Sequence, residues 1–191
     1  REGVGFFLEC PPLQPMLAGS GLFAWGPGQA QFMVNLPRVA SLLAILIDGL
    51  ETEGGRVSLR RDGLPQLDYP VGPALQEAMK AAHEVMARIH LAAGASFSAS
   101  LHKQPVTVSK PEDLPLLAAA PYGAFHTSLF TAHQMGGCSL GTVVDSSHRV
   151  HSFERLFVVD GSVLPTGLGV NPSETIYALA HRASDFVRDA T

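Results

Sequence analysis

Two stretches in the last third of the chain carry side chains that could hold a charged ligand and move a proton. The first, from His133 to Gly141, reads His-Gln-Met-Gly-Gly-Cys-Ser-Leu-Gly. The second, from Leu156 to Glu174, holds a carboxylate at Asp160. Histidine titrates near neutral pH and is the side chain most often used as a proton acceptor. Spacing alone, however, does not distinguish a catalytic histidine from one that only holds a loop.

The second stretch also predicts the elements that would position such a site. Its apolar run Leu156–Val159 predicts a buried strand that ends at Asp160. Asn171 fits a helix N-cap, Pro172 the first helical position and Glu174 the acidic position of a capping box. The apolar residues at helical spacing behind them are Ile176, Leu179, Ala180, Ala183 and Val187. Because ligands collect at the carboxyl ends of strands and a helix N-terminus stabilises negative charge, this pattern predicts a site for a cofactor that becomes anionic.

Five short motifs, in their order and spacing, resemble the C-terminal signature of the glucose-methanol-choline (GMC) flavin oxidoreductases. The motifs are His133, Gly136-Gly137-Cys138, Val143-Val144-Asp145, Asp160-Gly161-Ser162 and Asn171-Pro172. Within the family, their wording is most similar to that of the long-chain fatty alcohol oxidases and their bacterial relatives. Gly137 stands where the family usually has Thr, and Leu140 stands where Met is common. We expect these departures to alter packing more than chemistry.

The resemblance implies FAD as the cofactor and the oxidation of an alcohol CH–OH group to a carbonyl. In such a reaction a base removes the hydroxyl proton, and the flavin accepts the hydride because no side chain can. The resemblance makes His133 the catalytic base. It makes Asn171 the partner that holds the substrate oxygen through an amide that does not titrate. Many relatives have a second histidine in place of this asparagine.

The resemblance also places residues of both motifs of the second stretch against the flavin. Asp160 and Gly161 would contact its ribityl-phosphate part, and Asn171, Pro172 and Ser173 would lie at the isoalloxazine. Pro172 has no N–H, so the backbone donors at this helix end must come from later residues. The simpler alternatives are that Asp160 only ends a strand and that Asn171 only caps a helix.

On this resemblance we predict an α+β fold, as the C-terminal part of a two-domain FAD oxidoreductase. Residues 1–120 would be part of a substrate-binding domain of mostly antiparallel strands with one long helix. Residues 121–191 would be the C-terminal part of the FAD-binding domain and contribute its last strand and closing helix. The boundary falls near the Pro/Ala/Leu-rich linker of residues 111–121, for which we expect one helical turn.

Local patterns predict the elements of the first 120 residues. The clearest is a helix from Pro73 to Ala93, which Gly94 is placed to end. A β-hairpin is expected from residues 54–59 and 66–69, which alternate in strand fashion around an Asp62-Gly63 turn. Further expectations are a strand at residues 6–10, a loop at residues 11–28, and either a helix or a buried strand at residues 42–47.

A motif that a flavin enzyme of this family needs does not occur in the 191 residues. A Gly-x-Gly-x-x-Gly turn between a strand and a helix would hold the pyrophosphate of FAD. Of the glycine pairs spaced by one residue, none has a third glycine at the required distance. We therefore expect a fragment, or one chain of a split enzyme, whose partner is the absent N-terminal FAD-binding segment. Alone, it should bind FAD weakly or not at all and be inactive.

Composition limits the other functions. Hydrophobic residues make up 46% of the chain and charged residues 16%, which is enough to build a core. The net charge of −4 argues against a nucleic-acid-binding protein, because such proteins carry a basic surface. The apolar run of residues 39–47 is too short to span a bilayer and we find no signal peptide in this chain, so the localisation stays unknown and we expect a soluble or membrane-peripheral protein. Cys10 and Cys138 are expected to be reduced, buried thiols.

Two other functions stay open beside the alcohol oxidoreductase. One is a non-catalytic interaction module derived from such an enzyme, which the missing glycine motif favours. The weaker one is a metal-dependent hydrolase, but the pairs His83/His90 and His148/His151 lack further ligands, so half-exposed or solvated roles and no metal are expected. The substrate of the oxidoreductase would be a small-molecule alcohol. The apolar segments Leu22-Phe23 and 42–46, with the fatty-alcohol-oxidase likeness, suggest a bulky apolar one.

Overall fold

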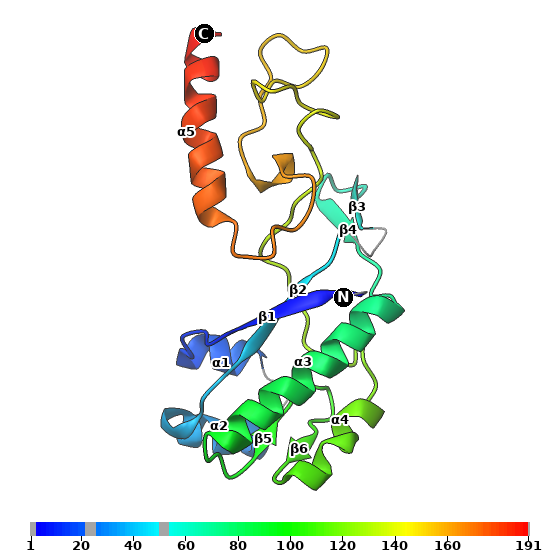
Figure 1. Cartoon of the computed structure of the whole chain (residues 1–191), viewed down its shortest axis with the longest axis vertical. Helices are drawn as coiled ribbons and strands as arrows, with labels where there is room; N and C mark the ends of the chain where they lie inside the picture. Colours follow the sequence, from blue (N-terminus) through cyan, green and yellow to red (C-terminus); the bar gives the residue numbers. More distant parts are fainter. Residues whose placement is uncertain (1–2, 22–25, 50–53, 191) are drawn as a thin grey trace. The chain divides into compact units, whose positions relative to one another are not determined.

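The computed structural model describes residues 3–21, 26–49 and 54–190, and the protein has an α+β fold with small antiparallel sheets (Figure 1). The residues group into two compact units. Within the described ranges, the first unit comprises Arg1–Leu46 and Glu51–Leu129, and the second comprises Ile47–Leu50 and Phe130–Thr191. The predicted α+β class is confirmed.

The first unit is built on one long helix, α3, and on strands that pair two by two. Strand β1 pairs with β2, and β3 with β4 and β5 with β6 form antiparallel pairs. The elements in chain order are β1 (Gly5–Glu9), α1 (Pro15–Gly21), α2 (Pro27–Asn35), the 3-10 helix η1 (Leu36–Arg38), β2 (Leu43–Ile47), β3 (Arg56–Leu59), β4 (Pro65–Asp68), α3 (Pro73–Ala92), β5 (Ser98–Ala99), β6 (Thr107–Val108), the 3-10 helix η2 (Pro111–Asp113) and α4 (Pro115–Ala119). The last residue of β2 belongs to the second unit.

Helix α3 supplies the core of the first unit, as its apolar spacing predicts. Its buried residues are Leu75, Ala78, Met79, Ala82 and Ala87. Ala87 continues into a buried cluster with Val108 on β6 and with Leu114 and Leu117 at α4. The helix ends at Ala92, and Gly94 follows with φ +86°, a left-handed conformation that glycine adopts without steric cost. The predicted helix is confirmed to within one residue.

The predicted β-hairpin is also confirmed, as β3 and β4. Arg56 pairs with Asp68, and Val57 with Leu67. Its turn closes through a hydrogen bond from the Gly63 N–H to the Arg60 carbonyl, at 3.0 Å. Gly63 has φ +80°, which explains why the Asp-Gly sequence marks this turn.

The region of residues 11–47 contains helices where the sequence predicted a loop. The predicted loop at residues 11–28 is wrong in part, because α1 and the start of α2 lie within it. Both helices begin at a proline, Pro15 and Pro27, which suits the first turn of a helix although proline also marks loops. The strand predicted near the N-terminus is confirmed as β1, and the open choice at residues 42–47 is resolved as strand β2. Leu22 and Phe23 lie outside the described residues.

In the second unit, the described residues form one α-helix, α5 (Ser173–Asp189), one 3-10 helix, η3 (Gly161–Val163), and loops with isolated β-bridges. Helix α5 follows the predicted apolar spacing. Ala183 is fully buried, whereas the remaining members of the stripe are half-buried, namely Ile176, Leu179, Ala180 and Val187. The closing helix of the prediction is therefore confirmed.

The buried strand predicted at Leu156–Val159 is wrong. Of the described residues in this run, Phe157 alone forms a β-bridge, with Arg149. Leu156 and Val159 remain 47% and 38% exposed. Two backbone hydrogen bonds join this run to residues 148–150: Val150 N donates to Leu156 O at 2.8 Å, and Val158 N donates to His148 O at 3.0 Å. Residues 148–150 are a short turn segment, so they cannot pair with the run as a neighbouring strand would.

Two further expectations concern the thiols and the membrane. Cys10 and Cys138 are free, as expected, but Cys10 is exposed and Cys138 is half-buried, so the expected burial is wrong. Within the described residues, no helix combines the length and the apolar character needed to cross a bilayer, and this includes the 20-residue α3.

Candidate active site

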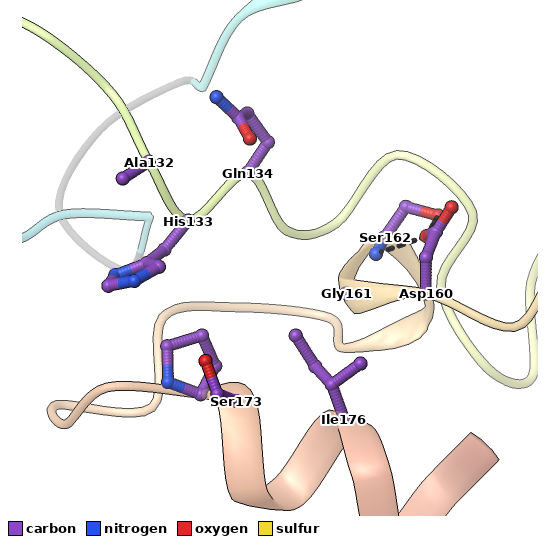
Figure 2. A pocket seen from close by; sticks show the side chains of 9 residues that line it. Ala132, His133, Gln134, Asp160, Gly161, Ser162, Ser173 and Ile176 are labelled. Carbon is purple, nitrogen blue, oxygen red and sulfur yellow. Dashed lines mark hydrogen bonds between the residues drawn. The ribbon is translucent and has the colours of Figure 1, made fainter.

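The second unit contains a cavity of about 410 Å³ that collects residues from both chemical stretches of the sequence (Figure 2). It is bordered by the loop before the Gly-Gly-Cys motif, by η3, and by the first turn of α5. The lining residues are Ala132, His133, Gln134, Asp160, Gly161, Ser162, Pro172, Ser173 and Ile176. Of the predicted site residues, the cavity brings together His133, Asp160, Gly161, Pro172 and Ser173.

A ladder of backbone hydrogen bonds holds the two stretches side by side. Gly136 N donates to Leu164 O at 2.7 Å, Cys138 N to Ser162 O at 2.9 Å, and Leu140 N to Val163 O at 2.9 Å. These bonds fix the Gly-Gly-Cys motif along η3. This main-chain pairing brings the loop that carries His133 and the segment that carries Asp160 and Gly161 to one cavity, and Figure 2 shows the His133 ring and the Asp160 side chain at opposite ends of it.

Two glycines permit this close approach. Gly136 has φ +86°, and a Cβ there would also lie 3.3 Å from the Pro165 carbonyl oxygen. At Gly161 a Cβ would lie 3.0 Å from the Ile176 Cδ1 atom and 3.3 Å from the Gln134 carbonyl oxygen. Both distances are tighter than ordinary packing. Glycine at 161 thus lets the first turn of α5 and the His133 loop meet at the cavity.

The Asp160 carboxylate is held in one orientation at the cavity edge. It caps η3, and its Oδ1 atom accepts hydrogen bonds from Ser162 N at 2.8 Å and from Ser162 Oγ at 2.5 Å. The residue is exposed. A carboxylate that is fixed by its own loop can accept hydrogen bonds from a ligand without losing its place.

The start of α5 differs from the predicted cap. The helix begins at Ser173, and Pro172 occupies the cap position with φ −88° and ψ −4°. Pro172 accepts the first helical bond, from Ile176 N at 2.9 Å, so the cap lies one residue later than the sequence indicated. The cap residue Pro172 makes no side-chain cap hydrogen bond, and the predicted positions, with Asn171 as the N-cap and Glu174 as the third helical residue, are wrong by one residue. Asn171 is exposed and precedes the lining residue Pro172, but it does not itself line the cavity.

The lining combines several kinds of chemistry. Figure 2 shows the His133 ring on the loop side of the cavity, with Ser173 and Ile176 on the α5 side. His133 is half-buried, so it can meet a ligand while remaining open to proton exchange. The first turn of α5 offers backbone N–H groups and the positive end of the helix dipole. Together these groups can hold a polar ring that gains negative charge and can move a proton beside it.

The motif Val143-Val144-Asp145 has a structural role and lies outside this lining. Val144 is fully buried. Asp145 Oδ1 accepts from Ser147 N at 2.8 Å and from Arg149 N at 3.1 Å, which closes the turn. The hydrogen bond from the Arg149 backbone, followed by the bond from Ser147 and the Arg149 guanidinium, lowers the pKa of the Asp145 carboxyl.

Sequence reasoning misjudged the burial of one histidine. His148 was expected in a solvated loop, but it is fully buried, with φ +65° and its Nδ1 atom 3.2 Å from the Val158 carbonyl oxygen. In the first unit His83, His102 and Tyr122 form a packed cluster that the sequence did not reveal, because the three residues are far apart in the chain. Within the described residues, no group of three or more His, Cys, Asp or Glu side chains could hold a metal ion.

The chain is similar to known oxidoreductases over most of its length. The family model for GMC oxidoreductase matches residues 51–180. A long-chain-alcohol oxidase of Arabidopsis thaliana is 28% identical along the whole chain, which corresponds to 27% of that protein. A cholesterol oxidase of Acinetobacter baumannii is 52% identical over 63 residues, or 30% of this chain and 11% of that protein.

A cholesterol oxidase of Mycobacterium tuberculosis is 40% identical over 73 residues, or 36% of this chain and 13% of that protein. The chain thus spans about a quarter of the length of the long-chain-alcohol oxidase and less of the two cholesterol oxidases. The family match extends through both chemical stretches, from before His133 to beyond Ser173. On this match, together with the site geometry, the chain belongs to the GMC oxidoreductase family.

Proposed function

We propose that the cavity of the second unit holds the reactive part of FAD, and that this chain carries the catalytic end of an enzyme that oxidises an alcohol CH–OH group to a carbonyl. GMC oxidoreductases are in general flavin-dependent. The observation that carries the proposal is the convergence of His133, Asp160 and the first turn of α5 on one cavity.

The residues present fit a flavin. The cavity, at about 410 Å³, lies within the size range of small-molecule and cofactor sites. Gly161 leaves free the space that a larger side chain would fill between Gln134 and Ile176. The helix N-terminus suits a ring system that becomes anionic, and Ile176 supplies an apolar surface for its face. The carboxylate of Asp160 suits hydroxyl groups of a ribityl chain.

Each residue then has a defined task. When bound, the flavin supplies the acceptor for the hydride. His133 accepts the proton of the substrate hydroxyl at an imidazole nitrogen, a role for which its half-buried position keeps it accessible. Asp160 and Gly161 hold the ribityl-phosphate side, and Pro172 and Ser173 border the ring side. Ser173 and later residues provide the donors, because proline has no N–H.

Asn171 has the least direct support among the proposed catalytic residues. It precedes Pro172, which lines the cavity, but it is itself exposed. We keep it as the group that holds the substrate oxygen because the family resemblance assigns it that role and its amide can donate a hydrogen bond without titrating. Replacing Asn171 should then weaken substrate binding and turnover together, whereas a residue with no part in the reaction would leave both unchanged.

The proposed roles of the two parts of the chain follow the family. Residues 1–120 would serve a substrate-binding domain, and residues 121–191 the C-terminal part of an FAD-binding domain. The 191 residues contain no Gly-x-Gly-x-x-Gly motif to hold the pyrophosphate. FAD binding and activity should therefore need an FAD-binding segment in addition to these residues, and that segment is the partner we propose.

For the substrate we propose a bulky apolar alcohol, with no role for nucleic acid. The relatives are named as long-chain-alcohol and cholesterol oxidases, and both names refer to large apolar alcohols. Strand β2 and its surroundings add an apolar, half-buried segment in the first unit.

The test is anaerobic reduction of the flavin by alcohols in the enzyme assembled with an FAD-binding segment. We expect a long-chain primary alcohol to bleach the visible flavin band, and a short polar alcohol to bleach it far more slowly. Bleaching by short polar alcohols alone would contradict the substrate class. A folded, flavin-loaded protein that no alcohol reduces would contradict the oxidoreductase.

The second candidate is a non-catalytic binding module derived from such an enzyme. The observation that favours it is the missing glycine motif. A chain that does not hold FAD has no hydride acceptor, so His133 would have no alcohol oxidation to serve as a catalytic base. It predicts that no flavin is retained in any preparation of the folded protein, including one assembled with an FAD-binding segment.

A further inference from the structure

A buried cluster of polar aromatic side chains lies at the side of α3 in the first unit. His83 on α3, His102 and Tyr122 pack with ring centroids 4.8 to 5.3 Å apart. His102 is 2% exposed and Tyr122 is 6% exposed. Such a cluster is unusual in an interior, since histidine and tyrosine carry polar atoms that need partners.

Those partners are incomplete. His102 Nδ1 lies 2.7 Å from Ser100 Oγ, but its Nε2 atom and the Tyr122 hydroxyl have no hydrogen-bond partner among the described residues. In the doubly protonated imidazolium, both nitrogens must donate, so Nε2–H would stay unpaired in an apolar site with a full positive charge. The site therefore accepts His102 only as neutral imidazole.

The charged groups that act on His102 make this preference stronger. His83 on α3 and His126 on the segment after Tyr122 would each repel a positive charge at His102. Burial is the larger cause, and together these effects lower the pKa of His102 to about 4. Burial also lowers the pKa of His83 and raises the pKa of Tyr122 to about 12, so all three rings are neutral at pH 7.

The cluster clamps residues 121–128 onto the rest of the unit. Lys103 N donates to His126 O at 2.8 Å and Ser128 N donates to Leu101 O at 2.9 Å, on either side of His102. Within the clamped segment, Phe125 has φ +66° and is 90% exposed. A bulky residue in the left-handed region is strained and keeps that conformation only where its neighbours impose it. Release of residues 121–128 would therefore let Phe125 leave its strained left-handed conformation.

We propose that this cluster is an acid-sensitive latch: protonation of His102 releases residues 121–128 from residues 101–103 and from His83 on α3, while α3 itself stays helical. The released segment runs on into Phe130 and His133, so acidification would loosen the chain that leads to the proposed base. This inference does not depend on flavin binding.

The direction follows from proton linkage. The folded-state pKa of His102 is lower than the 6.5 of a free histidine, so the latched state binds fewer protons than the open state between these values. The latch is fully stable above pH 6.5 and weakens as the pH falls toward 4. For these two pKa values, opening should rise about 60-fold from pH 7 to pH 4.5.

Amide hydrogen exchange in the full chain tests the proposal. The Lys103 and Ser128 amides report on the latch, and amides in the middle of α3 report on global unfolding. After correction for the intrinsic exchange rate, we expect protection at Lys103 and Ser128 to fall by tens of fold between pH 7 and pH 4.5, while the α3 amides stay protected. Unchanged protection, or equal loss in α3, would overturn the latch.

Two variants and a control assign the effect to the cluster. In His102→Gln, which cannot titrate at this position, the loss of protection on acidification should be much smaller than in wild type, with only the contribution of His83 left. In His83→Gln, which keeps His102 but removes a repelling neighbour, the loss should be smaller than in wild type. The latter variant decides the matter if the former does not fold. His151→Gln, at an exposed histidine of the second unit, should behave as wild type. A wild-type response in His83→Gln would contradict the proposal.

Discussion

The two units use histidine in opposite ways. His102 is 2% exposed, packs between aromatic rings, and has one ring nitrogen with no partner among the described residues. His133 is half-buried and borders an open cavity with a carboxylate, a serine and a helix N-terminus. The first histidine is held neutral by burial. The second is reached from the cavity. Access to a cavity, more than residue type, therefore separates the catalytic candidate from the structural one.

The backbone around each histidine reflects the same difference. Near His133, glycines at 136 and 161 bring main-chain segments together and leave room for a ligand. Near His102, side chains of α3 and of residues 100–127 fill the space. The contrast predicts that substitutions in the first unit act on stability, whereas those at the cavity act on both local structure and ligand binding.

The largest stability effect should come from the core beneath the histidine cluster. Met79 is 3% exposed, and its carbonyl oxygen lies 2.8 Å from His83 Nδ1. Met79→Ala should lower the free energy of unfolding by about 2–5 kcal/mol, because it leaves a cavity in α3's packing. Met16→Ala, at an 84% exposed methionine, should change it by less than about 0.5 kcal/mol. The measurement is urea unfolding at pH 7. If Met79→Ala and Met16→Ala lowered the free energy of unfolding equally, the contrast between core and surface would be contradicted.

At the cavity, Gly161→Ala should destabilise the second unit by about 1–3 kcal/mol, because the new Cβ would meet Ile176 at 3.0 Å and Gln134 O at 3.3 Å. Gly137→Ala is the matched control. A Cβ there would meet Ser162 at an ordinary 3.8 Å, so stability should stay within about 0.5 kcal/mol of wild type. Thermal unfolding of both variants separates a tight cavity wall from a merely glycine-rich loop.

The Asp160 cap should have an intermediate effect. Asp160→Ala removes the acceptor for Ser162 N and Ser162 Oγ and should cost about 0.5–2 kcal/mol. Asp160→Asn keeps an oxygen acceptor and should lose little. Thermal unfolding compares the two. If alanine and asparagine behave alike, the carboxylate does not organise η3, and its orientation at the cavity needs another explanation.

The smallest effect returns to the buried cluster and has the opposite sign. Tyr122→Phe removes a buried hydroxyl that has no partner among the described residues, so it should be neutral or stabilise by about 1 kcal/mol. Tyr177→Phe, at a 71% exposed tyrosine, should have no effect beyond about 0.5 kcal/mol. Urea unfolding measures both, and a clear loss for Tyr122→Phe would mean that its hydroxyl is hydrogen-bonded in solution.

The sequence predicted the elements with strong local signals. Helices α3 and α5 follow from their apolar spacing, and the β3–β4 hairpin follows from Asp62-Gly63. The strand at Leu156–Val159 failed because apolar composition alone does not supply a neighbouring strand. The cap at Asn171 failed because Pro172 itself occupies the cap position, although proline usually marks the first helical position.

The part of the candidate site that consists of short contiguous motifs was predictable from the sequence. The cavity joins His133, Asp160, Gly161, Pro172 and Ser173, all of which were identified from motif order. The His83–His102–Tyr122 cluster could not be predicted, since its members are separated by long stretches of chain and no short pattern links them. Burial of this kind depends on tertiary packing, which residue spacing does not encode.

The central claim is that His133 is the base of an alcohol oxidation at this cavity. The direct measurement is the anaerobic rate of flavin reduction by a long-chain alcohol in the flavin-loaded enzyme, for wild type, His133→Ala and His151→Ala. The account predicts a loss of about 10²–10⁴-fold in His133→Ala and a wild-type rate in His151→Ala, with flavin retained in all three. A His133→Ala enzyme that reduces its flavin within a few-fold of the wild-type rate would contradict the account.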